Sequence, residues 1–287
     1  MAPELWIIAT LCAASFQTIR FTLQKILADG NLSPLGATYS RFIFAAPWIV
    51  LFSLIFLLFA VGGGLAQILA TVSVILVFKS RNFAVGITLK KTEVILTALV
   101  GLILIGEGVS TISMFLICLG GAGVFFLSKK VSSVDRSNFS ILNKSAVYGL
   151  LSGLLFAISA VCYRSATLSV VSDLVYLRAG FTLLIVILSQ SFVMTIWLAL
   201  FEPGQIKLVW LERKKGFWVG VTSLGGSFFW FTAFTLQNAA YVKAVGQIEL
   251  IFSLLITTLF FKERILNREI LGMLLIGISA LGLILVV

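Results

Sequence analysis

Four glutamates occupy repeated positions in long apolar stretches of this chain. Glu93 and Glu107 are 14 residues apart, and Glu249 and Glu263 have the same spacing. An ionised carboxylate deep in apolar surroundings needs water, a proton or a cationic partner, because burying an unpaired charge is costly. Glu93 and Glu249 lie deep enough to need such a partner. Glu107 and Glu263 end their stretches, and we interpret them as structural.

Basic side chains accompany the two deeper glutamates. Lys90 and Lys91 precede Glu93, and Lys90 shares a helix face with it at i, i+3. Eight of the 21 Lys and Arg residues lie inside apolar stretches, and they are Arg20, Lys25, Arg41, Lys90, Lys91, Arg164, Arg178 and Lys243. An alternative for Lys25, Arg41, Lys90 and Lys243 is that their long side chains extend from helix ends to lipid headgroups.

We predict that these residues line one central pocket that binds a small-molecule substrate. Arginine and lysine would attract an anionic group, whereas Glu93 or Glu249 could bind a cationic group or a coupling proton. Gln67 and Trp230 could face the same pocket, although a Trp in an apolar span also serves packing. The predicted substrate-binding residues are Arg41, Gln67, Lys91, Glu93, Tyr176, Arg178, Trp230, Lys243, Gln247 and Glu249.

The composition indicates the elements that hold these residues. Of the 287 residues, 60% are hydrophobic and 11% are charged, and the mean hydropathy is +1.13. Soluble domains are about 45–50% apolar and about 25% charged. We therefore expect a polytopic membrane protein of all-α class, because backbone groups in lipid must satisfy one another within helices. We expect it to be a multi-pass protein of the bacterial inner (plasma) membrane.

Several function classes are excluded or disfavoured by residue types. The chain has no histidine, which argues against zincins, haem proteins and histidine-dependent hydrolases. Cys12, Cys118 and Cys162 are far apart and lack metal-site spacing. We therefore expect no metal and no cofactor. The net charge of +10 accompanies apolar spans, which favours anionic lipid headgroups over nucleic acid as the partner.

Apolar runs predict ten helices that span the bilayer. Ser33 and Pro34 suit the N-cap and first position of the second helix, and Pro47 predicts a kink within it. A link at residues 62–64, which are three glycines, would join the second and third helices; one long span there would instead give nine helices. The predicted spans are 5–27, 36–60, 64–82, 85–106, 109–127, 145–168, 171–200, 216–236, 240–261 and 267–287.

The two halves of the chain repeat. TEVILTALVGLILIGEGVS and IELIFSLLITTLFFKERIL align at an offset of 156 residues, and Tyr39, Arg41 and Phe44 match Tyr176, Arg178 and Phe181 at an offset of 137. The second half therefore holds 19 extra residues, which cover the predicted loop FEPGQIKLVWLERKKG. Five helices per half is an odd number, so the repeats must have opposite orientations, as in many secondary transporters. We predict a first repeat at 1–128, a linking loop at 129–144 and a second repeat at 145–287.

At these residues the sequence resembles the EamA-type family of the drug/metabolite transporter superfamily. The resemblance covers essentially the whole chain and implies ten helices in two inverted five-helix repeats. It also implies cytoplasmic termini, whereas loop charges by the positive-inside rule favour external ones. The matching stretches are GATYSRFIFAAP in the second predicted helix, SRNFAVG between the third and fourth, IGEGVS closing the fourth, and FFKERILNREILGMLLIGISALGLIL from the ninth onward.

We therefore predict a secondary transporter that moves a small metabolite by alternating access. The sequence leaves amino acids, drug-like cations and nucleotide-derived metabolites open as substrates, and also monomer against dimer. No GxxxxGK[ST] motif is present, which argues against direct use of ATP. The alternative is an intramembrane lipid-modifying enzyme, which is disfavoured because no cluster of acid, base and nucleophile is evident. The prediction is thus that the protein is not an enzyme.

Overall fold

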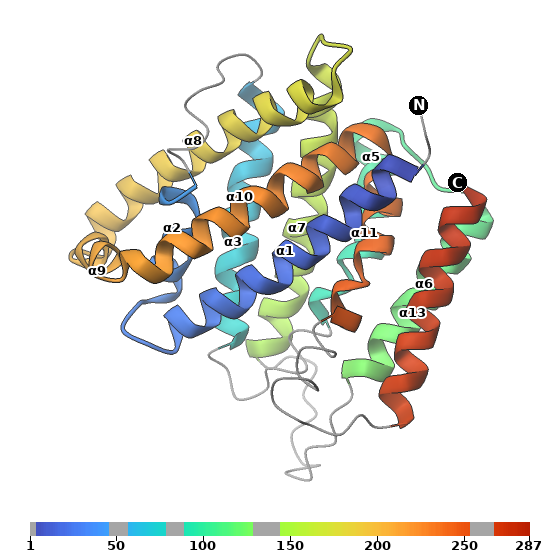
Figure 1. Ribbon diagram of the computed structural model, residues 1–287, viewed down its shortest axis with the longest axis horizontal. Helices are drawn as coiled ribbons and strands as arrows, with labels where there is room; N and C mark the ends of the chain where they lie inside the picture. The colour runs from blue at the N-terminus through green and yellow to red at the C-terminus, as the bar shows by residue number, and fades with distance from the viewer. Residues whose placement is uncertain (1–3, 46–56, 79–88, 129–143, 253–266) are drawn as a thin grey trace.

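The computed structural model describes residues 4–45, 57–78, 89–128, 144–252 and 267–287 as helices joined by short connections (Figure 1). No strand occurs in these ranges. The all-α class predicted from composition is therefore confirmed for this part of the chain. The helices in chain order are α1 (Glu4–Ala28), α2 (Pro34–Ile43), α3 (Leu57–Phe78), α5 (Glu93–Ile105), α6 (Thr111–Ser128), α7 (Lys144–Ser169), α8 (Val175–Phe201), α9 (Gln205–Leu211), α10 (Arg213–Leu236), α11 (Ala239–Gly246) and α13 (Asn267–Val286).

Among these ranges, five helices are long and apolar enough to cross a membrane. They lie within α1, α3, α7, α8 and α10, while α5, α6 and α13 contribute shorter apolar segments. A span needs about 20 apolar residues in a helix. The chain therefore carries several helices suited to lipid, which supports a membrane protein.

Local signals in the second helix act as expected where they are described. Ser33 is the N-cap of α2, its hydroxyl accepts a hydrogen bond from the Gly36 N–H at 3.0 Å, and Pro34 occupies the first turn. This satisfies one backbone donor that the helix leaves free. The kink expected at Pro47 lies outside the described residues.

Two local predictions about connections are wrong. The glycines at 62–64 do not form a link, because α3 runs through them as a continuous helix. Close packing accounts for Gly63, since a Cβ there would lie 2.8 Å from the Tyr163 ring, whereas nothing lies within 4 Å of a Cβ on Gly62. The extra segment of the second half is also not all loop, because it contains the short helix α9.

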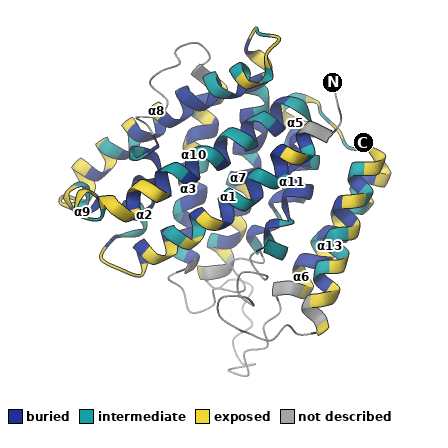
Figure 2. Ribbon diagram, viewed as in Figure 1, coloured by how far each residue is buried: buried dark blue, intermediate teal, exposed yellow. Residues whose placement is uncertain are grey.

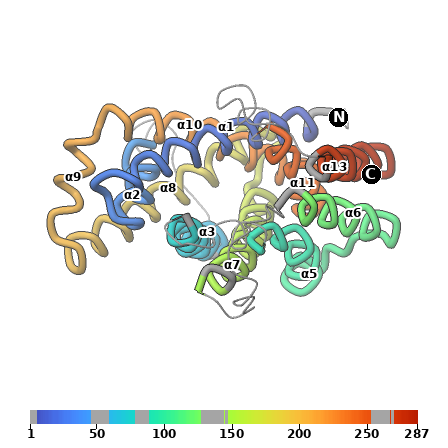
Figure 3. The backbone as a smooth tube through the Cα atoms, turned by 90° about the horizontal axis from the view of Figure 1, so that it is seen from below, coloured from blue at the N-terminus to red at the C-terminus, as the bar shows by residue number. Residues whose placement is uncertain are grey.

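The helices pack so that elements of the two sequence halves alternate. α1 lies against α10, α3 against α7, and α6 against α13. In Figure 3, α1 and α10 lie in one layer with α3, α5 and α7 below it, while α6 with α13 and α9 occupy opposite ends. The halves therefore share one core.

Burial follows this arrangement. Figure 2 shows the central helices mostly buried, while exposed residues are frequent on α13 and around α9. Many exposed side chains are large and apolar, for example Ile103, Phe192 and Leu285. Apolar surface on this scale is unusual for a protein in water but suits contact with lipid.

Replacing Gly220 with alanine should destabilise the protein. An added Cβ would lie 2.5 Å from the Phe44 carbonyl carbon, so α10 and the end of α2 would have to separate. Overpacking of this kind costs about 1–3 kcal/mol. We expect a lower midpoint of thermal unfolding in detergent for G220A.

Gly180 on α8 provides the matched control, because nothing lies within 4 Å of its added Cβ. G180A should be neutral or slightly stabilising, since alanine favours helix more than glycine does. Equal midpoints for G220A and G180A would refute the close contact between α10 and α2.

Candidate functional site

Each of the two deeper glutamates follows a short turn that interrupts its helix. α11 ends at Gly246, a turn occupies 247–248, and helix resumes at Glu249; a turn at 91–92 likewise precedes Glu93, the first residue of α5. The two turns are 156 residues apart, which is the offset of the sequence repeat. Each carboxylate thus lies at the start of a helical segment, where the helix dipole favours negative charge.

Backbone hydrogen bonds tighten at both turns. The Thr92 N–H donates to the Leu89 carbonyl and the Ile248 N–H to the Val245 carbonyl, both at 3.1 Å and three residues back rather than four. Turns of this kind within a helix often mark a hinge or a functional site. The sequence predicted uninterrupted helices here and is wrong at these positions, because neither turn contains proline or glycine to mark it.

Each glutamate forms an ion pair with a lysine of the other half of the chain. Lys243 Nζ lies 3.3 Å from Glu93 Oε1, and Lys91 Nζ contacts Glu249 Oε1. Lys90 Nζ adds a longer contact of 3.9 Å to Glu93 Oε2, on the face that the i, i+3 spacing predicts. All five side chains are buried. The two halves are therefore joined by reciprocal buried ion pairs.

Neighbouring side chains complete this cluster. The Gln17 amide of α1 donates to the other oxygen of Glu249. Lys90 Nζ lies 5.0 Å from the centre of the Phe156 ring, and Lys243 Nζ lies 4.7 Å from that of Trp230. Aromatic faces attract cations and offset part of the cost of removing them from water.

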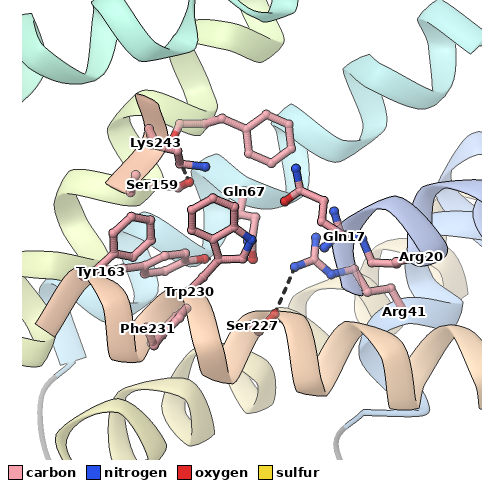
Figure 4. A pocket seen from close by; sticks show the side chains of 13 residues that line it. Gln17, Arg20, Arg41, Gln67, Ser159, Tyr163, Ser227, Trp230, Phe231 and Lys243 are labelled. Atoms are coloured by element: carbon pink, nitrogen blue, oxygen red, sulfur yellow. Dashed lines mark hydrogen bonds between the residues drawn. The ribbon is translucent and has the colours of Figure 1, made fainter. Parts of the chain in front are cut away.

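A narrow cavity of about 20 Å³ lies beside the ion pairs, between α1, α2, α3, α7, α10 and α11 (Figure 4). It combines cationic, amide, hydroxyl and aromatic side chains within an otherwise apolar bundle. Its lining residues are Gln17, Arg20, Arg41, Gln67, Phe156, Ser159, Ala160, Tyr163, Ser227, Trp230, Phe231, Phe234 and Lys243.

Arg41 is held in the cavity wall by hydroxyl groups. Its Nε donates to Ser223 Oγ at 2.8 Å, Nη1 to Thr71 Oγ1 at 3.3 Å and Nη2 to Ser227 Oγ at 3.4 Å. Only 2% of the residue is exposed. Its hydrogen-bond acceptors within the described chain are neutral, so its charge is oriented but not neutralised.

A neutral amide–phenol network forms the opposite part of the wall. The Tyr163 hydroxyl donates to Gln67 Oε1 at 2.9 Å, and Gln190 Nε2 donates to the same oxygen at 2.9 Å and to the Gly64 carbonyl at 2.9 Å. These bonds fix the Gln67 side chain between α3, α7 and α8. Its position in the cavity is therefore set by three helices.

The structure gathers most of the predicted site residues. Arg41, Gln67, Trp230 and Lys243 line the cavity, while three others form the adjacent ion pairs: Lys91, Glu93 and Glu249. Gln247 is buried at the turn, and neither its amide oxygen nor its amide nitrogen has a hydrogen-bond partner in the described structure. Whether these residues bind a substrate stays a prediction.

Two predicted site residues lie elsewhere, so their placement in the pocket is corrected. Tyr176 is 56% exposed near the start of α8. Arg178 donates to the Thr167 carbonyl at 3.1 Å and the Leu168 carbonyl at 2.9 Å. Its charge stabilises the carbonyl end of α7. The repeated Tyr-x-Arg-x-x-Phe motif therefore has different surroundings in the two halves.

Sequence reasoning missed Gln17, Tyr163 and Ser227 as cavity residues, and it noted Arg20 only as a charge within a span. Gln17 and Arg20 are three residues apart on α1, so they share a polar face of an apolar helix. That spacing is a signal that could have placed them. Tyr163 and Ser227 carry no comparable signal, because single hydroxyl residues are common in membrane helices.

Arg164 has a structural position outside the cavity. Its Nε lies 2.5 Å from Glu107 Oε2, and its Nη1 donates to the Phe234 and Gln237 carbonyls, both at 2.7 Å. It therefore joins the end of α10 to the connection after α5. This contact agrees with the structural interpretation of Glu107.

Comparisons with known proteins define the fold but no family. No protein-family profile matches this sequence, and no curated protein matches it. A crystal structure of another protein is similar over 99% of this chain and 98% of that one, with a TM-score of 0.76 and 12% sequence identity. At that identity the likeness shows a shared fold alone. The part of the chain that the structure describes is all-helical, and several of its helices are able to span a membrane.

Proposed function

We propose that this protein is a secondary transporter that moves a small metabolite across a membrane. The observation that carries the proposal is the polar, cationic cavity enclosed between helices of both halves. Charged and hydrogen-bonding side chains are costly inside an apolar bundle and usually mark a substrate or ion pathway. A purely structural bundle would not need them at its centre.

We further propose ten spans arranged as two inverted five-helix repeats. Reciprocal packing supports this arrangement. In the proposed repeats α10 is the counterpart of α3, and α7 is the counterpart of α1. The contact of α3 with α7 is therefore matched by the contact of α10 with α1. Two further contacts each join a helix to its own counterpart in the other half: α2 packs on α8, and α6 packs on α13. The interrupted helices at equivalent positions add support, since broken helices commonly form transporter sites near the bilayer midplane.

Alternating access would then involve movement of one half against the other around the cavity. The ion pairs Lys91–Glu249 and Lys243–Glu93 cross between the halves, so they would stabilise the state described here and break or exchange during the cycle. Membership of the EamA-type family and residence in the bacterial inner membrane remain part of this proposal, supported by the sequence resemblance.

Transport should be measured with purified protein in liposomes. Three labelled aromatic probes of similar size differ in charge: phenyl phosphate, phenylalanine and benzyltrimethylammonium. We expect saturable uptake of at least one probe above that of protein-free liposomes, and acceleration of its uptake when the same unlabelled compound is loaded inside.

Lipid extracts of the same preparation should be analysed by mass spectrometry. A new lipid product together with no saturable uptake of any probe would contradict the transporter proposal and favour a lipid-modifying enzyme. Absence of both would refute transport of small aromatic metabolites.

A further inference from the structure

We propose that Arg20 and Arg41 form a subsite for the acid group of an organic anion, and that the aromatic wall beside them contacts its apolar part. The shared chemistry is an oxyanion, either carboxylate or phosphate. This inference rests on the proposed function only in taking the cavity as the substrate site. It narrows the substrate to the anionic class.

The balance of buried charge supports an anionic ligand. Among the residues that the structure describes, five buried cations face two buried carboxylates, a surplus of three positive charges. The cations are Arg20, Arg41, Lys90, Lys91 and Lys243, and the carboxylates are Glu93 and Glu249. An uncompensated charge inside a membrane protein is costly. A bound anion would reduce this surplus.

The two arginines supply two of these three surplus charges, and both lie in the cavity wall. Arg20 is 4% exposed, and its Nε has no hydrogen-bond acceptor in the described structure. Arg20 and Arg41 both line the cavity, and Figure 4 shows their side chains beside one another. Like charges at this proximity repel. An oxyanion bound between the two arginines would offset this repulsion and accept a charge-assisted hydrogen bond from each.

The unsatisfied polar atoms of the cavity point to the same ligand. Of the lining residues, Arg20 Nε and Trp230 Nε1 are the buried atoms without a partner in the described structure. Both are hydrogen-bond donors and neither can accept. A ligand that meets them must therefore present acceptor atoms, which a carboxylate or a phosphate does.

Hydroxyl groups hold the Arg41 guanidinium in an orientation suited to binding an oxyanion. Each of its three nitrogens donates one hydrogen bond to a neutral hydroxyl. A guanidinium has five N–H groups, so two remain for a ligand. The hydroxyls orient the charge without neutralising it, which lowers the entropy that binding would cost.

The aromatic side of the cavity suits an apolar group. Trp230 and Phe234 stack with ring centres 5.7 Å apart, and Tyr163 lies 4.4 Å from Phe231. The carboxylates that could attract a cationic ligand already pair with lysines. The chemistry of the cavity wall therefore favours an organic anion with a flat apolar part over a cation.

Binding should be measured by calorimetry on the detergent-purified full chain, with phenyl phosphate and benzoate as anionic probes and benzyltrimethylammonium as the cationic probe. We expect at least one anion to bind and the cation not to bind. Arg20→Gln and Arg41→Gln should each weaken anion binding about tenfold or more, because a hydrogen bond to a charged group is lost. The tighter of the two anions then identifies phosphate or carboxylate chemistry.

Arg178→Gln is the matched control, since Arg178 is the repeat counterpart of Arg41 but lies outside the cavity. It should bind the anion as the unchanged protein does. If Arg41→Gln fails to fold, Arg20→Gln still decides, because Arg20 has no described hydrogen bond to lose.

Three results would overturn the subsite: no binding of either anion at millimolar concentration, binding of the cation alone, or wild-type anion affinity in Arg20→Gln. Failure of the transporter proposal is distinguishable from these. Anion binding without uptake in liposomes would retain the subsite and reject transport of the anion. Uptake of phenylalanine without anion binding would retain the transporter proposal and reject the subsite.

Discussion

Glu93→Gln should lower the free energy of unfolding by about 3–5 kcal/mol, the usual cost of removing one partner from a buried ion pair. The Glu93 carboxylate compensates Lys243 at 3.3 Å and Lys90 at 3.9 Å. Glutamine keeps the shape but leaves both lysines without that charge in a buried place. The loss should be measured by SDS-induced unfolding in mixed micelles.

Two variants control this result. Glu93→Gln combined with Lys243→Gln should recover part of the loss, because one stranded cation is removed with its partner. Glu212→Gln breaks a surface ion pair, in which Glu212 lies 3.0 Å from the exposed Lys215. This change should lower the free energy of unfolding by at most about 1 kcal/mol. Equal losses in Glu93→Gln and Glu212→Gln would mean that the buried pair contributes no more than a surface one.

Lys91→Glu and Glu249→Lys should each reduce uptake in liposomes to background. Either change places two like charges in direct contact in a buried site, where their repulsion is poorly screened. The double variant, with the charges exchanged, should restore a measurable part of the uptake of whichever probe the unchanged protein transports. Restored uptake in the double variant would show that the two residues interact directly, because the losses of uptake in two independent single variants would add.

We expect this rescue to be partial. A lysine at 249 would lie at the start of a helical segment, where the helix dipole disfavours a cation. Gln17 can turn its amide to accept from lysine instead of donating to glutamate, so it does not prevent rescue. A double variant that is folded yet as inactive as the single ones would show that Lys91 or Glu249 acts in transport beyond their mutual ion pair.

The interrupted helices give a physical reason why these pairs could move. At each turn the regular hydrogen-bond ladder is replaced by tighter bonds, so a change of angle there disturbs fewer bonds than within a regular helix. Lys91 lies in one turn, and Glu249 directly follows the other. A small rotation at either turn would therefore separate the pair and alter the contact between the halves.

The class of protein followed from composition alone. A chain that is 60% hydrophobic and 11% charged has too few polar residues to cover its apolar ones with a water-compatible surface. Helices in lipid are the arrangement that agrees with this composition. Spacing along one helix was also informative, because helix geometry is periodic. The N-cap at Ser33 and the i, i+3 contact of Lys90 with Glu93 are both present.

Tertiary structure decided which charges meet across helices and which cations stay uncompensated. Arg41 and Arg178 have the same sequence motif, yet Arg41 points into the cavity and Arg178 binds the carbonyl end of α7. The helix turns at 91–92 and 247–248 were likewise invisible in sequence, since neither contains a residue that breaks helices. Sequence periodicity identifies the face of a helix, but the group opposite that face is set by packing between segments as distant as Lys91 and Glu249, which are 158 residues apart.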